Sequence, residues 1–147
     1  MPIHHTNELI FDIPDEFIDK TSHIFSLSHD GPSEFNIVIT HHPIGLNETL
    51  QTYANQMITE LKKALPQFQL ISNDTEVIAE QPALKIVYSW FQENQTLYQI
   101  QVSFFSVDHL DKRQVIQITA TSLNMLSEKW DKVFANILNS IKLRQNI

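Results

Sequence analysis

The sequence predicts an α+β fold, with a single antiparallel β-sheet of about six to seven strands and two main α-helices. Segments in which apolar and polar residues alternate cover most of the chain, as is typical of half-buried strands. Only two segments show helical spacing, and they do not alternate with the strands in the βαβ order of a parallel sheet. The 147 residues fit one domain, which we expect to span 1–147 and to remove roughly 68–70% of its unfolded surface from water.

Three short strands are predicted first. Residues 8–13, 22–28 and 35–41 each alternate between apolar and polar side chains, and the first run stops before Pro14. Residues 30–32 read Asp-Gly-Pro, which is a turn signal between the second and third runs. We therefore expect three antiparallel strands at the start of the chain.

A helix is predicted over residues 50–65. Asn47 and Glu48 suit the start of a helix, and Pro66 cannot continue one. The apolar residues of this segment recur at the three-four spacing of an amphipathic helix: Leu50, Tyr53, Ala54, Met57, Leu61 and Leu65.

Four more strands and a closing helix follow. The strands are predicted at 68–78, 83–91, 97–105 and 113–121, with polar turns at Asn73-Asp74, 93–95 and 108–112. This order predicts a meander. Apolar residues from Leu126 to Ile141, Trp130 among them, then recur at helical spacing, and we expect Asn124 or Ser127 to cap that helix.

Composition excludes several classes of function. The net charge of −7 repels phosphate backbones and no cluster of Lys or Arg offsets it, so nucleic-acid binding is not expected. The chain has no Cys, which excludes disulfides and cysteine nucleophiles. No run approaches the ~18 apolar residues of a membrane span and residues 1–14 lack signal-peptide features, so we expect a cytoplasmic protein without stable membrane insertion.

The segment 97–105 has two unlike faces. One parity holds a core-like row, Tyr98, Ile100, Val102 and Phe104, and the other holds Leu97, Gln99, Gln101 and Ser103. The segments 22–28 and 35–41 repeat this pattern. Ile24 and Val38 are the single aliphatic residues on the less apolar face of each segment, which we call the weaker face. Neutral polar groups around lone aliphatics suit an apolar partner, which indicates binding rather than chemistry. Alternatively, this face lies under a helix or simply faces solvent.

No group of residues predicts catalysis. The doublets at 4–5 and 41–42 are histidines, but adjacent strand residues point to opposite faces and make poor chelating pairs. The acidic residues at 12, 15 and 16 flank a proline, and those at 108 and 111 fall in a predicted loop, where carboxylates are commonly solvated. Two glycines allow no phosphate-cradling loop. We expect no enzyme activity, no metal and no cofactor.

The order of several short landmarks resembles the DcrB-like domain family, and in particular the Eag chaperones of bacterial type VI secretion. The resemblance covers nearly the whole chain. Its landmarks are Asn7-Glu8 with residues 11–14 (FDIP), residues 23–25 (HIF), Gly31-Pro32, the helix from Tyr53 to residues 65–68 (LPQF), residues 88–90 (YSW), and Leu97 through Gln101-Val102. Their order and spacing, rather than any single motif, carry the match.

The resemblance implies a PsbP-like homodimer that holds the hydrophobic N-terminal helices of a toxin effector until it is loaded for export. Aliphatic side chains of the family's groove contact the client helix, and glutamines bond to its polar groups. The client-binding positions that the resemblance implies here are Ile24, Val38, Met57, Leu61, Leu65, Leu97 and Gln101, with Gln99 beside the last. The chain departs from the family at Ser22, where an aliphatic residue is usual, and at Met57, where a glutamine is usual.

The predicted function is therefore a cytoplasmic chaperone or adaptor that shields the apolar helices of a type VI effector. The alternative is a non-enzymatic α+β module that binds a small molecule or a protein, and a hydrolase with an unrecognised site is a weaker third. An open apolar groove would favour the chaperone, and a closed cavity of a few hundred Å³ would favour the small-molecule module. Met57, Leu61 and Leu65 share the stripe of Leu50 and Tyr53, so they also fit an ordinary core role.

Overall fold

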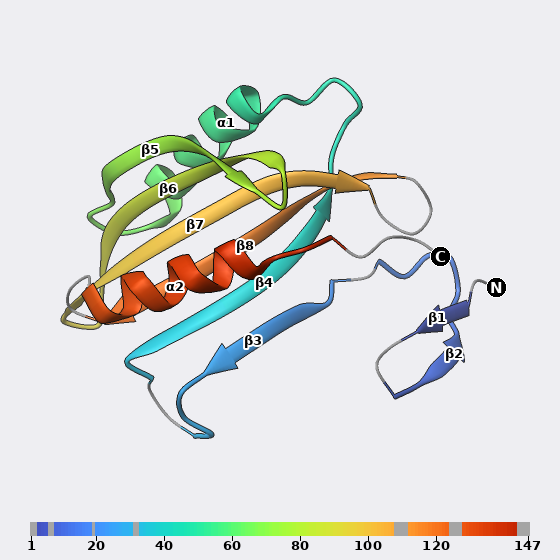
Figure 1. Cartoon of the computed structure of the whole chain (residues 1–147), viewed down its shortest axis with the longest axis horizontal. Helices are drawn as coiled ribbons and strands as arrows, with labels where there is room; N and C mark the ends of the chain where they lie inside the picture. Colours follow the sequence, from blue (N-terminus) through green and yellow to red (C-terminus); the bar gives the residue numbers. More distant parts are fainter. Residues whose placement is uncertain are drawn as a thin grey trace.

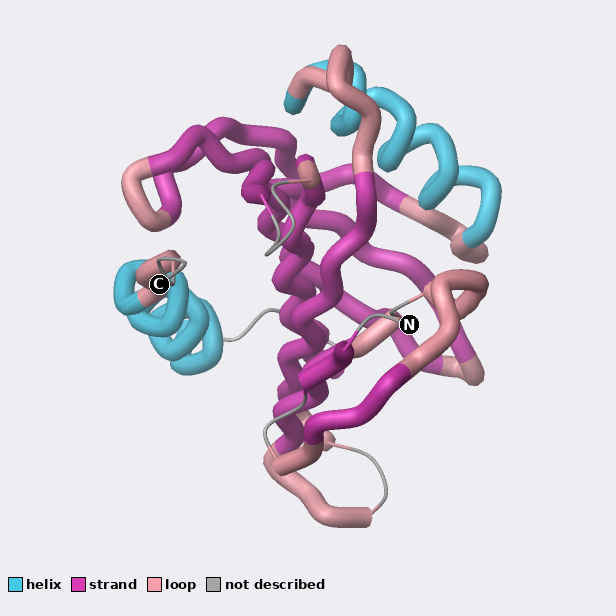
Figure 2. Tube along the Cα trace, turned by 90° about the vertical axis from the view of Figure 1, so that its right-hand side faces the viewer, coloured by secondary structure: helices cyan, strands magenta, loops and turns pink. Residues whose placement is uncertain are grey.

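Six strands form one antiparallel sheet with a helix on each side (Figures 1 and 2). The computed structural model describes residues 3–5 (backbone only), 8–18, 20–30, 33–107, 112–123 and 128–143. The strand order is β3-β4-β8-β7-β6-β5. The elements are β3 (Ser22–Ser26), β4 (Phe35–Pro43), α1 (Leu50–Ala64), β5 (Gln69–Ile78), β6 (Gln81–Gln92), β7 (Gln95–Val107), β8 (Arg113–Leu123) and α2 (Glu128–Ser140). The predicted α+β fold with one main sheet and two helices is confirmed.

The first predicted strand does not join this sheet. β2 (Ile10–Asp12) pairs instead with β1 (Ile3–His5) in a separate two-stranded sheet. The prediction that this strand belongs with the next two was wrong because alternation identifies a strand without naming its pairing partner.

α1 begins with a capping box at Thr49. The backbone N–H of Thr52 donates to Thr49 Oγ1 at 3.1 Å, and the N–H of Thr49 donates to Thr52 Oγ1 at 3.0 Å. The predicted start at Asn47 or Glu48 was slightly early, and Glu48 accepts a hydrogen bond from the Thr52 hydroxyl at 3.1 Å. The helix ends before Pro66, as predicted.

The turn predicted at Asn73-Asp74 was wrong. These residues lie inside β5, opposite Ile86 and Lys85, and the chain reverses at Ala79-Glu80 with φ values of 50° and 64°. β5 is an edge strand. Polar side chains are typical of turns but are also accommodated in strands at the edge of a sheet. The turn predicted at 93–95 is confirmed, whereas the predicted turn at 108–112, apart from Lys112, and the predicted caps at Asn124 or Ser127 lie outside the described residues.

The main core lies between the sheet and α2. Trp130, Phe134 and Leu138 of α2 pack on a row of β7 that includes Ile100, Val102 and Phe104, as the parity predicted. Phe35 stacks on Trp130 at 4.9 Å between ring centroids. A smaller core lies under α1, where Ala54 packs with Leu84, Ile86 and Tyr88 of β6.

Among the described residues, no helix is long and apolar enough to cross a bilayer.

Candidate binding face

The strand registers bring the predicted residues of the weaker faces onto the α1 side of the sheet. Ile24 of β3 lies opposite Val38 of β4, Val38 lies opposite Thr119 of β8, and Thr119 lies opposite Gln101 of β7. Directly opposed residues point to the same side of a sheet. Four strands therefore contribute one row of side chains, which ends at Ile86 in the α1 core.

Neutral polar side chains surround this row. Leu97 lies farther along β7, between Trp90 and Leu123, and Gln99 lies between Tyr88 and Thr121. The residues on the same side of β3, β4, β8 and β7 include Ser22, Ser26, Asn36, Thr40, Gln99, Ser103, Gln117 and Thr121. We call this surface the binding face. Across the strands it runs from Ile24 on β3 to Gln101 on β7, and its outlying members are Ser22 on β3 and Leu97 on β7. Its residue types suit an apolar ligand that also carries hydrogen-bonding groups.

Exposure falls steeply from the edge of the binding face toward α1. Ile24 is 69% exposed and Val38 is half-buried, whereas Leu97 and Gln101 are 8% and 5% exposed. The prediction that this face is not sealed inside the protein therefore holds for its outer half, and α1 lies over the neighbouring strand β6. A charge at Leu97 would be buried, so only the outer residues can be altered without a cost in stability.

The three predicted helix residues belong to the α1 core. Met57, Leu61 and Leu65 are half-buried and pack around Ala54, Leu84, Ile86 and Tyr88. They have the core role that the sequence left open, each keeps part of its surface exposed, and Met57 lines a cavity together with Gln117 of the binding face.

The two predicted glutamines differ in their hydrogen bonds. The indole N–H of Trp90 donates to Gln99 Oε1 at 2.9 Å, and Gln99 Nε2 donates to Thr121 Oγ1 at 2.9 Å. Gln101 Oε1 accepts a longer bond of 3.4 Å from the Tyr88 hydroxyl, and its Nε2 is buried without any hydrogen-bond partner. A buried donor without a partner costs ~1–3 kcal/mol. Gln101 thus has an unused donor, and Ser103 Oγ on the same face is also buried without a hydrogen-bond partner.

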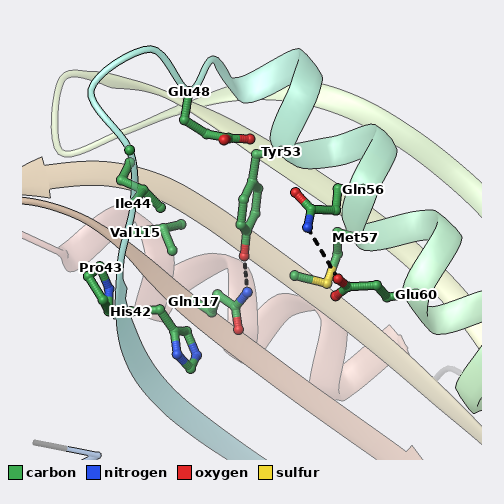
Figure 3. A pocket seen from close by; sticks show the side chains of 11 residues that line it. His42, Pro43, Ile44, Glu48, Tyr53, Gln56, Met57, Glu60, Val115 and Gln117 are labelled. Atoms are coloured by element: carbon green, nitrogen blue, oxygen red, sulfur yellow. Dashed lines mark hydrogen bonds between the residues drawn. The ribbon is translucent and has the colours of Figure 1, made fainter. Parts of the chain in front are cut away.

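A cavity of about 430 Å³ lies between α1 and strands β4 and β8 (Figure 3). Tyr53 points into it from α1, and its hydroxyl accepts a hydrogen bond from Gln117 Nε2. Burial raises the pKa of Tyr53 to about 12; the Ser103 side chain acts to lower this pKa, and the carboxylates of Glu60 and Glu48 act to raise it. Several lining residues are exposed (His42, Pro43, Gly45, Gln56 and Glu60), so the cavity is open to solvent.

Sequence reasoning did not single out this cavity. Gln117 shares its parity with Thr119 and Thr121, so the polar face of residues 113–121 was a usable signal. The approach of Tyr53 to Gln117 depends on how α1 packs and could not be read locally. Nowhere in the described part of the chain do three His, Cys, Asp or Glu side chains gather in a way that could hold a metal ion.

The family model for DcrB matches residues 8–140 of the sequence. The chain belongs to the DcrB family. The DcrB-like prediction is therefore confirmed, with a match that spans both helices and the whole main sheet. No curated protein matches this DcrB-family chain.

Solved structures share the fold of this DcrB-family chain. PA94 of Pseudomonas aeruginosa, described as a protein of unknown function and a candidate regulator, aligns with a TM-score of 0.77 at 22% identity over 99% of both chains. LpqN of Mycobacterium tuberculosis, described as involved in cell envelope biogenesis, aligns with a TM-score of 0.55 at 13% identity over 86% of this chain and 85% of its own. A solution structure of PsbP from Synechocystis sp. PCC 6803 aligns with a TM-score of 0.41 at 11% identity over 92% of this chain and 85% of its own. At these identities the first two likenesses establish the fold alone.

Proposed function

We propose that this DcrB-family protein is a chaperone that binds and shields the apolar N-terminal helices of a type VI secretion effector before export. The observation that carries the proposal is the row of Ile24, Val38, Thr119 and Gln101, in which aliphatic side chains stand beside neutral polar groups on one side of the sheet. The landmark resemblance to the Eag chaperones supports the same role. On this proposal the protein acts in the cytoplasm and performs no catalysis.

The dimensions of the binding face suit one helix. Strands β3, β4 and β8, whose row residues Ile24, Val38 and Thr119 keep exposed surface, are separated by two gaps, which at ~4.8 Å each span ~10 Å. An α-helix with its side chains is ~10–12 Å wide. A client helix can therefore lie beside α1, against Ile24 and Val38 on the sheet and the exposed parts of Met57 and Leu61 on α1.

The residue types account for both affinity and selectivity. Covering ~500 Å² of an apolar helix contributes on the order of 12 kcal/mol at ~25 cal/mol per Å², before the costs of association. Apolar contact alone would accept any apolar helix. Gln101 Nε2 adds a donor that lacks a partner in the free protein, so a client that brings a hydroxyl or carbonyl oxygen to it is favoured. The side chains that cover Gln101 must shift slightly when the client binds.

The second candidate function is a small-molecule or protein-binding module, and the cavity beside Tyr53 favours it. Its volume of about 430 Å³ falls within the ~300–1,000 Å³ of ligand pockets. Its exposed rim, however, includes Glu60 and Gln56 and would leave much of a small ligand in water. We therefore place it second.

The test is co-expression of the full-length chain with the apolar N-terminal segment of an effector from the same genome, followed by co-purification. We expect a soluble complex with the unaltered protein and at least a tenfold loss of captured segment with Val38→Asp, because a carboxylate on the binding face would be desolvated by the client. Val77→Asp is the matched control, since Val77 is a 72% exposed aliphatic residue on the far edge strand β5.

Two results would contradict the proposal. One is a folded Val38→Asp protein that captures as much segment as the control, which would remove the binding face from the site. The other is an unaltered protein that stays soluble while every effector segment tested aggregates beside it. Circular dichroism of each variant establishes that it is folded.

A further inference from the structure

The cavity between α1, β4 and β8 lies at one end of the binding face. Its sheet side is formed by Val115 and Gln117 of β8 and by His42 of β4, which lies opposite Val115. Gln117 is itself a member of the binding face, and the row of Val38 is the next one along these strands. Ser103 of β7 lies opposite Gln117, and its Oγ is buried without a hydrogen-bond partner. The cavity and the binding face therefore form one continuous surface.

A helix of membrane length that lies on the binding face reaches this cavity. α1 runs along the strands, because Tyr53 near its start contacts Phe105, whereas Pro66 after its end accepts a hydrogen bond from the N–H of Phe91 near Leu97. From Leu97 to Phe105 the strand rises ~26 Å at ~3.3 Å per residue. A transmembrane helix spans ~30 Å of hydrocarbon. A client helix beside α1 therefore has one of its ends at the cavity.

The charged side chains that face the cavity are acidic. Glu48 and Glu60 line it, and no Lys or Arg is among its described lining residues (Figure 3). Arg113 lies close by, but its guanidinium donates to the backbone oxygens of Gly45 and Leu46 at 3.1 and 3.0 Å. That contact ties Arg113 to the loop before α1 and leaves the two carboxylates to face the cavity.

Hydrogen-bond acceptors converge on the same space. Gln117 Oε1 accepts a bond of 3.4 Å from the Thr40 hydroxyl, and Gln117 Nε2 donates to the Tyr53 hydroxyl, so this amide is used at both ends. A hydroxyl oxygen has two lone pairs, so Tyr53 keeps one for a ligand. Gln56 Nε2 donates to Glu60 Oε1 at 3.3 Å and holds that carboxylate at the rim (Figure 3). An ammonium group brings three donors and no acceptor, which matches this set.

We propose that the cavity receives the side chain of a Lys or Arg that flanks the apolar helix of the client, an inference that rests on the proposed function. Long basic side chains near the ends of membrane helices extend toward the polar interface. The Tyr53 ring and the Met57 thioether line a path for the apolar stem of such a side chain, and the carboxylates of Glu48 and Glu60 face its charged end. The contact would fix the direction of the client helix, which apolar contact alone leaves open.

A side chain held by a bound helix suits this cavity better than a free small molecule. Gln56 and Glu60 are exposed, so an untethered ligand would keep much of its surface in water. A side chain delivered by a helix that already lies on the binding face makes an intramolecular contact, which needs no affinity of its own to be occupied. The net charge of −7 adds a general attraction for a basic segment.

The test removes both carboxylates while keeping the side-chain shape. The full-length chain with Glu48→Gln and Glu60→Gln is co-expressed with the effector segment of the capture test, and the captured segment is measured at low and high salt. We expect roughly three- to tenfold less capture than with the unaltered chain, and a weaker dependence on salt. Glu128→Gln with Asp131→Asn is the matched control, because it removes two exposed carboxylates from α2, on the other side of the sheet.

An exchange of charges tests the contact itself. Replacing the Lys and Arg residues beside the apolar stretch of the segment by Glu should lower its capture by the unaltered chain by a similar factor. The Glu60→Lys chain should capture this altered segment better than the unaltered chain does. A role of Glu60 in folding alone would not produce such a rescue, and circular dichroism establishes that each variant is folded.

Two results would overturn the site. One is a folded Glu48→Gln, Glu60→Gln chain that captures as much segment as the control. The other is a captured segment that has no Lys or Arg beside its apolar stretch. Both results leave the chaperone role standing, whereas an unaltered chain that captures no segment contradicts the chaperone role and this site with it.

Discussion

The hydroxyl of Tyr88 donates to Gln101 Oε1 at 3.4 Å and leaves the Nε2 of that amide buried without a partner. Two residues earlier on the same face of β7, Gln99 has both polar atoms bonded, to Trp90 and Thr121. Two glutamines on one face therefore differ in their effect on stability. Gln99 links β6, β7 and β8 by hydrogen bonds, whereas Gln101 has an unpaired buried donor that lowers the stability of the free protein.

This difference predicts unequal effects of the same substitution. Gln101→Leu should change the free energy of unfolding by less than ~1 kcal/mol, because removal of the unpaired buried N–H groups offsets the loss of the long 3.4 Å bond from the Tyr88 hydroxyl. Gln99→Leu should lower it by ~1–2 kcal/mol, because the Trp90 indole N–H loses its acceptor. Urea denaturation followed by tryptophan fluorescence measures both.

The same pair tests the binding role of Gln101. Gln101→Leu should weaken capture of an effector segment by on the order of 1–2 kcal/mol if the amide bonds the client. A loss of more than ~2 kcal/mol in the stability of the free Gln101→Leu protein would show instead that the amide has an internal partner.

Alkaline pH should destabilise the protein through two tyrosines. Burial raises the pKa of Tyr53 and of Tyr88 from 10.0 to about 12. Between pH 10 and 12 the folded state therefore holds protons that the unfolded state has lost, so the free energy of unfolding should fall as the pH rises through this window. Below about pH 10 these two groups contribute no pH dependence, because both states are protonated.

Urea denaturation midpoints at pH 9, 10 and 11 measure this effect. Tyr88→Phe removes one of the two ionisable groups and should make the decline between pH 10 and 11 shallower than in the unaltered protein. Equal declines in the two proteins would mean that Tyr88 ionises as readily when folded as when unfolded.

The β6–β7 turn offers a stabilising change. Glu93 and Asn94 adopt φ values of 49° and 68°, a left-handed conformation that suits Asn and Gly better than Glu. We expect Glu93→Asn together with Asn94→Gly to raise the free energy of unfolding by ~0.5–1 kcal/mol. Thermal denaturation measures this, with Glu93→Gln as a control that keeps the unfavourable backbone. A gain of the same size in that control would assign the effect to the lost charge.

Local periodicity was enough to predict most elements and the side to which their residues point. Ile24, Val38 and Gln101 were assigned to one kind of face from parity alone, and the registers place them in one row. Parity depends only on the backbone of each strand, so distant contacts do not alter it. The prediction of a turn at Asn73-Asp74 was wrong because polar residues suit both a turn and an edge strand. Only the pairing of β5 with β6 decides between the two.

The sequence by itself determined the α+β class, the two helices, the DcrB-like relationship and the two unlike faces of β7. The tertiary structure alone decided that β3 and β5 are the edges, that Ile24 is open while Leu97 and Gln101 are covered, and that Tyr53 meets Gln117. The physical reason is that burial is a property of packing between distant segments. A side chain's direction follows from its own strand, but its exposure depends on which strand and which helix lie beside it.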